Sequence, residues 1–350
     1  MPDGDALVEC VPNVSEGRDA AAIAALAAAI RGVPGVHLLL VDAGVDAHRT
    51  VFTFAGPPEP VGDAAVRLAH AVAATVDMRT HSGAHPRLGA LDVCPFVPVR
   101  GTTLDRCAAL ARRVAATVAH DLDLPVYLYE AAAFDPERRA LPRLRAGQYE
   151  GLAARIAAPG SRPDFGPARV HPRLGAAIVG ARPYLVAWNV SLSTDDVRVA
   201  TRIAARVRTS GRVRVEPDGA RVRVPGLLPA VRAVGWVMPS YGHAQVSLNL
   251  LDVGVTPMHV AYDAIAREAD REGHRVIGSE LVGLVPLDAL REAGRDALGT
   301  AATTAGDDAL VAAAVARLGL DVVRGFDART RVLEYALDAC RTSGTPGRIS

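Results

Sequence analysis

Two histidines and an arginine stand together in the segment His81-Ser82-Gly83-Ala84-His85-Pro86-Arg87-Leu88-Gly89-Ala90-Leu91-Asp92. Its glycines permit backbone angles that other residues resist, and Pro86 fixes its own φ and favours an extended His85. Six of its residues return later as His171-Pro172-Arg173-Leu174-Gly175-Ala176, and both copies precede an apolar run. The pattern predicts a rigid loop, present twice, that holds a few polar side chains ahead of a strand.

The composition sets limits on the fold and on the partners. A chain of 350 residues is long for one core, so we expect two domains or subdomains. A net charge of +1, from 39 basic and 38 acidic residues, argues against a nucleic-acid partner. We find no run of the roughly 20 apolar residues that a membrane span needs, no leader peptide and no paired cysteine spacing. The sequence therefore predicts a cytoplasmic protein with buried thiols and no membrane partner.

Strand and helix patterns alternate along both halves of the chain. We expect strands at 6–11, 36–41, 49–55, 90–99 and 126–129, with helices at 18–31, 60–76 and 103–120. In the second half we expect strands at 176–190 (broken near Pro183), 221–224, 231–237 and 245–251, with helices at 195–209 and 258–272. The glycine-rich stretch 278–286 is interpreted as a buried structural strand. This order predicts an α/β (α+β) fold of two similar subdomains, with mostly antiparallel sheets and helices on the outer faces.

The stretch 134–172 is rich in Pro, Arg and Gly and is too long for an ordinary loop. It is either a functional segment or a connection between the halves. Within it, Asp164-Phe165-Gly166-Pro167 suits a loop that lies against a flat ligand, and a linker turn is the alternative. The chain has no glycine-rich phosphate loop and no GxGxxG motif after a strand, so a nucleotide-binding fold is not expected.

His85 is the candidate for proton transfer, because an ordinary imidazole titrates near neutral pH. The alternative is a histidine that only ties down its loop. His81 precedes it by four residues, a spacing that suits two metal ligands on a helix. Gly83 and Pro86 disfavour a helix there, so we expect a structural or substrate role and no metal.

Asp42 and Arg49 bracket a predicted turn between two strands. Residues at strand ends project into clefts, and the planar guanidinium of arginine matches a carboxylate. The alternative is an ordinary salt bridge across the hairpin. Asp46 and His48, within the turn, are expected to face solvent, although His48 could reach the site.

Several segments carry a resemblance to a known family. They are Val8-Glu9-Cys10-Val11-Pro12-Asn13-Val14-Ser15-Glu16-Gly17, Val41-Asp42-Ala43-Gly44, Arg49-Thr50-Val51, the run from His85 to Phe96, Pro125–Tyr129, Asp164–Pro167, Gly180–Arg182, Gln245–Ser247 and Leu281–Pro286. In this order they resemble formiminotransferase, the folate-dependent glutamate formimidoyltransferase of histidine breakdown. The resemblance covers nearly the whole chain, which ends before the cyclodeaminase domain of the animal enzymes, so it implies the monofunctional form.

The resemblance implies a fold, a reaction and an assembly. The fold is an N-terminal subdomain at 1–181 and a C-terminal subdomain at 182–340, with a ligand tunnel between them and a flexible tail at 341–350. The reaction moves a formimino group from N-formimino-L-glutamate to N5 of tetrahydrofolate, which is a co-substrate, and uses no metal. The assembly is a homodimer.

The resemblance also implies site residues. His85 matches the catalytic histidine, and Asp42 and Arg49 match substrate-binding residues. The folate-contacting loop matches Gly166, Pro167, Ala168, Arg169, Val170, His171, Pro172, Arg173, Leu174 and Gly175. Ala84 and Ser82 depart from the family, which often has glutamate and lysine there.

Those two departures leave other functions open. They are formyl transfer and formimidoylation of a different metabolite. Folate binding without catalysis is a separate alternative. A metal-dependent amidohydrolase that uses His81 and His85 is a further alternative.

Overall fold

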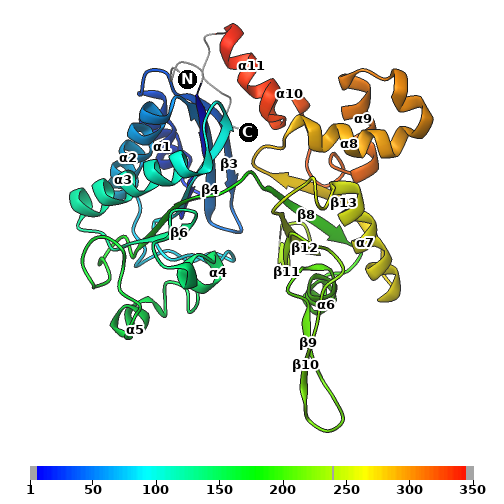
Figure 1. The fold of residues 1–350 in the computed structure, drawn as a ribbon, viewed down its shortest axis with the longest axis horizontal. Helices are drawn as coiled ribbons and strands as arrows, with labels where there is room; N and C mark the ends of the chain where they lie inside the picture. Colours follow the sequence, from blue (N-terminus) through cyan, green and yellow to red (C-terminus); the bar gives the residue numbers. More distant parts are fainter. Residues whose placement is uncertain (1–5, 239, 344–350) are drawn as a thin grey trace. The chain divides into compact units, whose positions relative to one another are not determined.

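The computed structural model describes residues 6–238 and 240–343, and these form two compact units. The first unit contains the chain up to Tyr184 and again from Cys340, and the second runs from Leu185 to Ala339 (Figure 1). Of the predicted tail at 341–350, residues 341–343 end helix α11 (Leu333–Ser343), and 344–350 lie outside the described residues.

The first unit is built on a mixed seven-stranded sheet. Its strands are β1 (Leu7–Cys10), β2 (Asn13–Val14), β3 (His37–Gly44), β4 (Arg49–Gly56), β5 (Leu91–Arg100), β6 (Val126–Glu130) and β7 (Ala177–Ala181). The order is β1-β4-β2-β5-β7-β6, with β3 paired to β4. The pairs β5–β7 and β6–β7 are parallel, and the others are antiparallel.

Three helices cover one face of this sheet: α1 (Ala20–Arg31), α2 (Pro58–Thr75) and α3 (Leu104–Leu122) (Figure 1). Asp19 and Thr103 start α1 and α3, because their side chains accept the unpaired N–H groups of the first turn. In β4, Phe52 and Phe54 pack into the core under the helices. Because side chains alternate along a strand, Arg49 points to the opposite face, on which part of the irregular segment packs.

The irregular segment belongs entirely to the first unit and is not a connection between the halves. It contains three short helices, η2 (Pro136–Arg138), α4 (Leu141–Leu144) and α5 (Leu152–Ala157), and then returns to the first sheet as β7. The predicted strand at 176–190 does break near Pro183. Its first part is β7, and its second part is β8 (Val186–Leu192), which lies in the other sheet.

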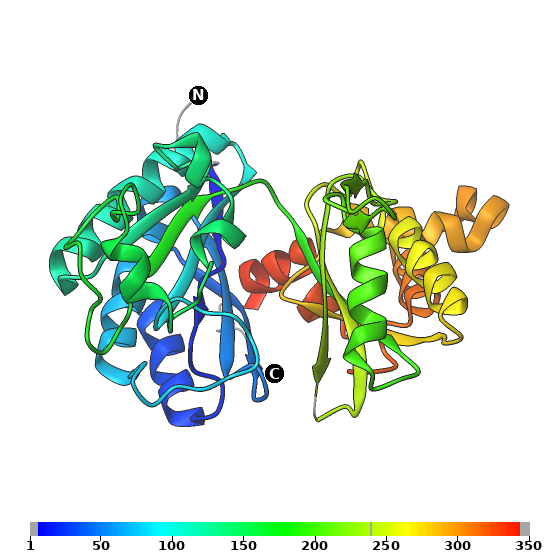
Figure 2. The ribbon, with the colours of Figure 1, turned by 90° about the horizontal axis from the view of Figure 1, so that it is seen from below.

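The second unit has a four-stranded antiparallel sheet. Its order is β11 (Val231–Met238), β12 (His243–Leu250), β8 and β13 (Val276–Val282). Strands β9 (Arg212–Val215) and β10 (Arg221–Val224) form a separate hairpin. Helices α6 (Val197–Val207) and α7 (Met258–Arg271) lie side by side against it (Figure 2). The chain continues through α8 (Leu287–Leu298), η3 (Gly299–Thr304), α9 (Asp307–Leu318) and α10 (Ala328–Arg331) into α11. The predicted fold class is confirmed, although the two sheets differ in size.

The stretch 278–286 forms most of β13, as expected for a structural strand. Cys10, Cys94 and Cys107 are buried free thiols, as the sequence predicted, whereas the prediction is wrong for Cys340, which is only half-buried. In the described part of the chain, no helix combines the length and apolar character needed to cross a bilayer.

Candidate active site

His85 lies in a loop whose contacts fix the state of its ring. Nδ1 is 2.7 Å from the carbonyl oxygen of Pro86 and 3.2 Å from Nη1 of Arg49. Two acceptors at 2.7 Å would repel each other, so we assign the proton to Nδ1, which donates to the carbonyl. The 3.2 Å approach of Arg49 is then a contact between two donors and not a hydrogen bond. The lone pair of the neutral ring is then on Nε2, and the loop holds His85 in the form that can accept a proton there.

Asp92, at the start of β5, joins the side chains around His85. It is fully buried, and its Oδ2 accepts hydrogen bonds from Nη1 of Arg49 at 2.6 Å and from Nη2 of Arg145 at 2.5 Å. Its Oδ1 accepts from the backbone N–H of Leu88 at 2.8 Å. Asn13 accepts from Nε of Arg49 at 2.8 Å. Arg49, Arg145 and Leu88 therefore meet at one carboxylate, and Asn13 joins the cluster through Arg49.

The electrostatics of this cluster keep His85 neutral. Burial and the positive charges of Arg49 and Arg145 lower the pKa of His85 to about 3. Burial also lowers the pKa of Arg49 to about 10, despite its pairing with Asp92. Burial would raise the pKa of Asp92, but the two arginines outweigh it and the pKa is lowered. Near neutral pH Arg49, Arg145 and Asp92 carry their charges beside a neutral imidazole.

The first half of the histidine loop packs against the turn before β4. The rings of His48 and His81 stack with centroids 4.2 Å apart. Nε2 of His81 lies 2.9 Å from the carbonyl of His48, and its Nδ1 accepts from Arg87 at 3.3 Å. Arg87 also pairs with Glu150 of the irregular segment, at 2.7 Å. The expectation that His48 faces solvent is therefore wrong, because the loop folds over its ring.

The contacts of His81 with His48 and Arg87 leave its ring nitrogens poorly placed to bind a metal ion. Both ring nitrogens of His81 are engaged within the loop, so the spacing of His81 and His85 does not create a pair of ligands. Over residues 6–238 and 240–343, no group of three or more His, Cys, Asp or Glu side chains is placed to hold a metal ion.

The two copies of the repeated motif lie against each other. Gly89 and Gly175 form an antiparallel bridge, and the backbone N–H of Ala90 donates to the carbonyl of Leu174 at 2.9 Å. In the second copy, Nδ1 of His171 accepts the backbone N–H groups of Arg173 at 3.2 Å and of Leu174 at 3.0 Å. One nitrogen of His171 therefore shapes its own loop.

Comparison with known proteins places this arrangement in a family. The model of the formiminotransferase domain, N-terminal subdomain, matches residues 7–182, and that of the formiminotransferase domain matches residues 187–338. The chain belongs to the formiminotransferase family.

The relatives differ in length. Glutamate formimidoyltransferase of Streptococcus pyogenes serotype M1 is 38% identical over 81% of this chain and 90% of its own length. That of Thermoplasma acidophilum is 39% identical over 81% of this chain and 89% of its own. Formimidoyltransferase-cyclodeaminase of Rattus norvegicus is 43% identical over 94% of this chain. The chain spans only 59% of that longer protein.

Among solved structures, a microcompartments protein from Desulfitobacterium hafniense DCB is 11% identical, with a TM-score of 0.20, over 79% of this chain and 93% of its own. At that score the likeness supports no conclusion about the fold.

In this formiminotransferase chain, Asp42 lies within β3 and not at its end. It is buried and stands in register with Val51, on the face of the sheet that carries Arg49. Arg49 pairs with the carboxylate of Asp92, at 2.6 Å. The predicted folate loop is anchored at its start, because Gly166 has a φ of +78° and packs on the carbonyl of Leu124.

Three residues of the cluster had no role assigned from the sequence: Asn13, Asp92 and Arg145. Asn13 and Asp92 lie inside the motifs that carried the family resemblance, so a polar side chain at the start of an apolar strand was the available signal. Arg145 had no such signal, because the irregular segment is rich in arginine and its partner Asp92 is distant in sequence.

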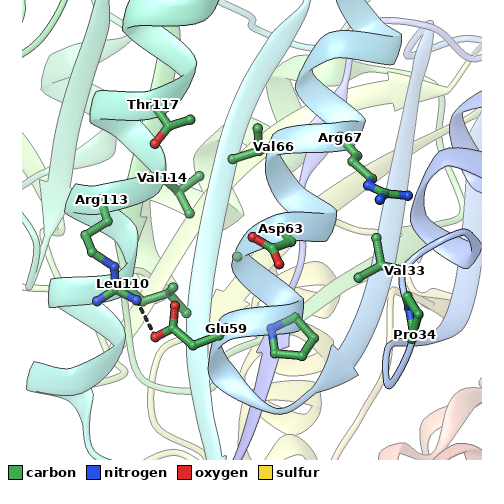
Figure 3. Close-up of a pocket in the computed structure, with 12 residues that line it drawn as sticks. Val33, Pro34, Glu59, Asp63, Val66, Arg67, Leu110, Arg113, Val114 and Thr117 are labelled. Atoms are coloured by element: carbon green, nitrogen blue, oxygen red, sulfur yellow. Dashed lines mark hydrogen bonds and ion pairs between the residues drawn. The ribbon is translucent and has the colours of Figure 1, made fainter.

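A groove of about 520 Å³ lies elsewhere on the first unit, between α2 and α3 (Figure 3). It is lined partly by the ion pair of Glu59 and Arg113, whose N–O distance is 2.5 Å. It opens on the helix layer, whereas Arg49 lies on the opposite face of the sheet. The groove is therefore not part of the His85 cluster.

Proposed function

We propose that this chain transfers a formimino group from N-formimino-L-glutamate to N5 of tetrahydrofolate, with His85 as general base and acid. Membership of the formiminotransferase family supports the reaction class. The observation that carries the role of His85 is its short Nδ1 contact to the Pro86 carbonyl, which leaves a basic Nε2 on a neutral ring. A neutral imidazole is the form needed to accept the first proton.

The proposed reaction requires two proton transfers. N5 of tetrahydrofolate attacks the amidine carbon and loses its proton, and His85 accepts it. The bond from that carbon to the glutamate nitrogen then breaks, and the nitrogen takes the proton back from His85. The ring ends as it began, and neither step needs a covalent intermediate or a metal.

The remaining predicted residues have binding roles in this proposal. Arg49 pairs with a substrate carboxylate, Asp42 orients His85 or the pterin, and the loop from Gly166 to Gly175 contacts the folate. The exposed position of much of that loop and its anchored backbone support the last role. The homodimer and the cytoplasmic location remain part of the proposal. A measurement of the mass of the protein in solution tests whether it is a dimer.

The test is an assay of purified protein with tetrahydrofolate and N-formimino-L-glutamate. Acid converts 5-formiminotetrahydrofolate to the methenyl form, which absorbs in the near ultraviolet. We expect signal from the wild type, at least about 100-fold less from His85→Ala, and a normal rate from His37→Ala, an exposed histidine at the start of β3. Near-normal turnover by His85→Ala would remove the assigned base.

The same assay separates the alternatives. Folate binding without turnover, followed by turnover with N-formylglutamate, would assign formyl transfer. Folate binding with no active donor would indicate a non-catalytic binding protein.

A further inference from the structure

The proton on Nδ1 of His85 depends on one backbone carbonyl. The carbonyl oxygen of Pro86 lies 2.7 Å from Nδ1 and accepts its proton, whereas Nη1 of Arg49, at 3.2 Å, is a donor that favours a lone pair on the same nitrogen. Because the hydrogen bond at one imidazole nitrogen selects the tautomer, these two neighbours favour opposite forms of the ring. Only the form with the proton on Nδ1 has a basic Nε2.

That carbonyl belongs to the peptide unit between Pro86 and Arg87, and the chain is fixed on both sides of it. The peptide unit is planar, and the proline ring fixes φ on its N-terminal side. On its C-terminal side, the backbone N–H of Leu88 donates to Oδ1 of Asp92 at 2.8 Å. The soft torsions next to the carbonyl are ψ of Pro86 and φ of Arg87, so the anchoring of Arg87 limits how far the carbonyl can rotate.

Arg87 is buried, with 7% of the residue exposed, and all three of its guanidinium nitrogens have partners. Nη1 and Nη2 donate to the two carboxylate oxygens of Glu150, at 3.0 and 2.7 Å. Nε donates to Nδ1 of His81 at 3.3 Å, and Nη2 also reaches the carbonyl oxygen of His81 at 3.3 Å. A bidentate pair fixes the orientation of a guanidinium as well as its position. Arg87 is therefore held both by the irregular segment and by the start of its own loop.

His81 extends this anchoring to the next strand. Its Nδ1 accepts from Arg87, so its Nε2 carries the proton and donates to the carbonyl of His48 at 2.9 Å. The His48 carbonyl belongs to the peptide unit that leads into Arg49 at the start of β4. One chain of contacts that begins at Glu150 thus holds the segments that carry both groups next to Nδ1.

We propose that Arg87 is a positioning residue for His85: it holds the Pro86 carbonyl against Nδ1 and so keeps Nε2 free to accept a proton. Glu150 is the anchor of Arg87 in this role. The inference rests on the proposed function, in which His85 is the base. Without the anchor, the peptide unit can rotate its carbonyl away, and Arg49 then donates to Nδ1. The proton moves to Nε2, and the ring cannot accept a proton there.

The first experiment reads the tautomer of His85 directly, by NMR of isotope-labelled imidazoles in the absence of substrate. At about pH 8, above the ordinary pKa of histidine, the ring is neutral in every variant. The nitrogen chemical shifts show which ring nitrogen carries the proton, and the spectrum of His85→Gln assigns the signals. We expect the proton on Nδ1 in the wild type and mainly on Nε2 in Arg87→Gln. A wild-type ring with its proton on Nε2, or an unchanged tautomer in folded Arg87→Gln, would overturn the proposal.

Kinetics separate positioning from a purely structural role. Arg87→Gln should lower kcat about tenfold or more and change KM little, because it removes no group assigned to substrate binding. Arg87→Lys keeps a cation near Glu150 without the bidentate geometry and should restore part of kcat. Arg143→Gln is the matched control, because it removes an exposed ion pair, with Glu137, from the same irregular segment. Equal kcat values for folded Arg87→Gln and Arg143→Gln would show that Arg87 does not position the base.

Glu150→Gln covers the case in which Arg87→Gln does not fold, because the Glu150 side chain is 64% exposed. It leaves Arg87 in place without its carboxylate. We expect the same change of tautomer to a smaller extent, with a smaller loss of kcat. An unchanged tautomer together with an unchanged kcat would overturn the anchoring by this carboxylate.

The outcomes separate this inference from the function on which it rests, because the tautomer is measured without substrate. Movement of the proton to Nε2 in Arg87→Gln, in a protein without formimino transfer, would retain the positioning role and reject the proposed reaction. Transfer activity with the same tautomer in wild type and in Arg87→Gln would retain the reaction and reject the positioning role.

Discussion

At the scale of single residues, His85 should make the stability of the protein depend on pH. Its pKa is about 3 in the folded protein and about 6.5 in an unfolded chain. Between these values the unfolded state binds a proton that the folded state does not, so the free energy of unfolding falls as the pH drops from about 6.5 toward 3. Denaturant unfolding in carboxylate-free buffer should show a flatter pH dependence for His85→Gln than for wild type. Equal slopes in the two proteins would mean that the folded-state ring titrates normally.

Sequence reasoning reached part of this cluster. His85 and Arg49 were found because a histidine in a constrained loop and an arginine at a strand end carry recognisable chemistry. Their arrangement depends on Asp92 and Arg145, which pair across 53 residues. No local pattern encodes such a contact, since the fold alone brings the two side chains together.

At the scale of elements, the crossing of the two repeated motifs explains why both copies contain glycine. A Cβ on Gly89 would lie 2.2 Å from the carbonyl oxygen of Ala176 and 2.4 Å from that of Leu174. Both are backbone atoms of the opposing copy, so the strands would have to separate. We expect Gly89→Ala to lower the free energy of unfolding by on the order of 3 kcal/mol. We also expect it to reduce turnover, because Asp92 lies on the same segment.

The control for that prediction is Gly325→Ala, because nothing lies within 4 Å of a Cβ at that position. Chemical denaturation of the two variants gives the comparison. A Gly89→Ala protein as stable as Gly325→Ala would show that the two motifs do not pack as described.

Elements were predicted best where periodicity and end signals agreed. Helix α1 begins one residue after its N-cap, Asp19, and ends before its C-cap, Gly32. Both ends of this helix are therefore set by residues next to it in the sequence. The helices after β13 were not predicted, although Pro286 stands directly before α8. The short helices of the irregular segment were missed because their contacts lie with distant strands, as Arg145 in the turn after α4 shows.

At the scale of the whole molecule, the two units bury separate cores and carry different spectroscopic reporters. Both tryptophans of the chain, Trp188 and Trp236, lie in the second unit. Trp188 is fully buried in that unit, whereas the His85 cluster and its fully buried Asp92 belong to the first. Tryptophan fluorescence therefore reports unfolding of the second unit, and circular dichroism reports both.

These reporters allow a prediction about cooperativity. Asp92→Asn keeps the size of the side chain but leaves Arg49 and Arg145 without their carboxylate, which should cost the first unit about 3 to 5 kcal/mol. If each unit unfolds on its own core, the variant adds an early transition by circular dichroism while the tryptophan transition keeps its wild-type midpoint. We expect this separation, because each unit has its own sheet and its own buried side chains. Coincident early transitions by both probes would instead show that the two units unfold as one cooperative block.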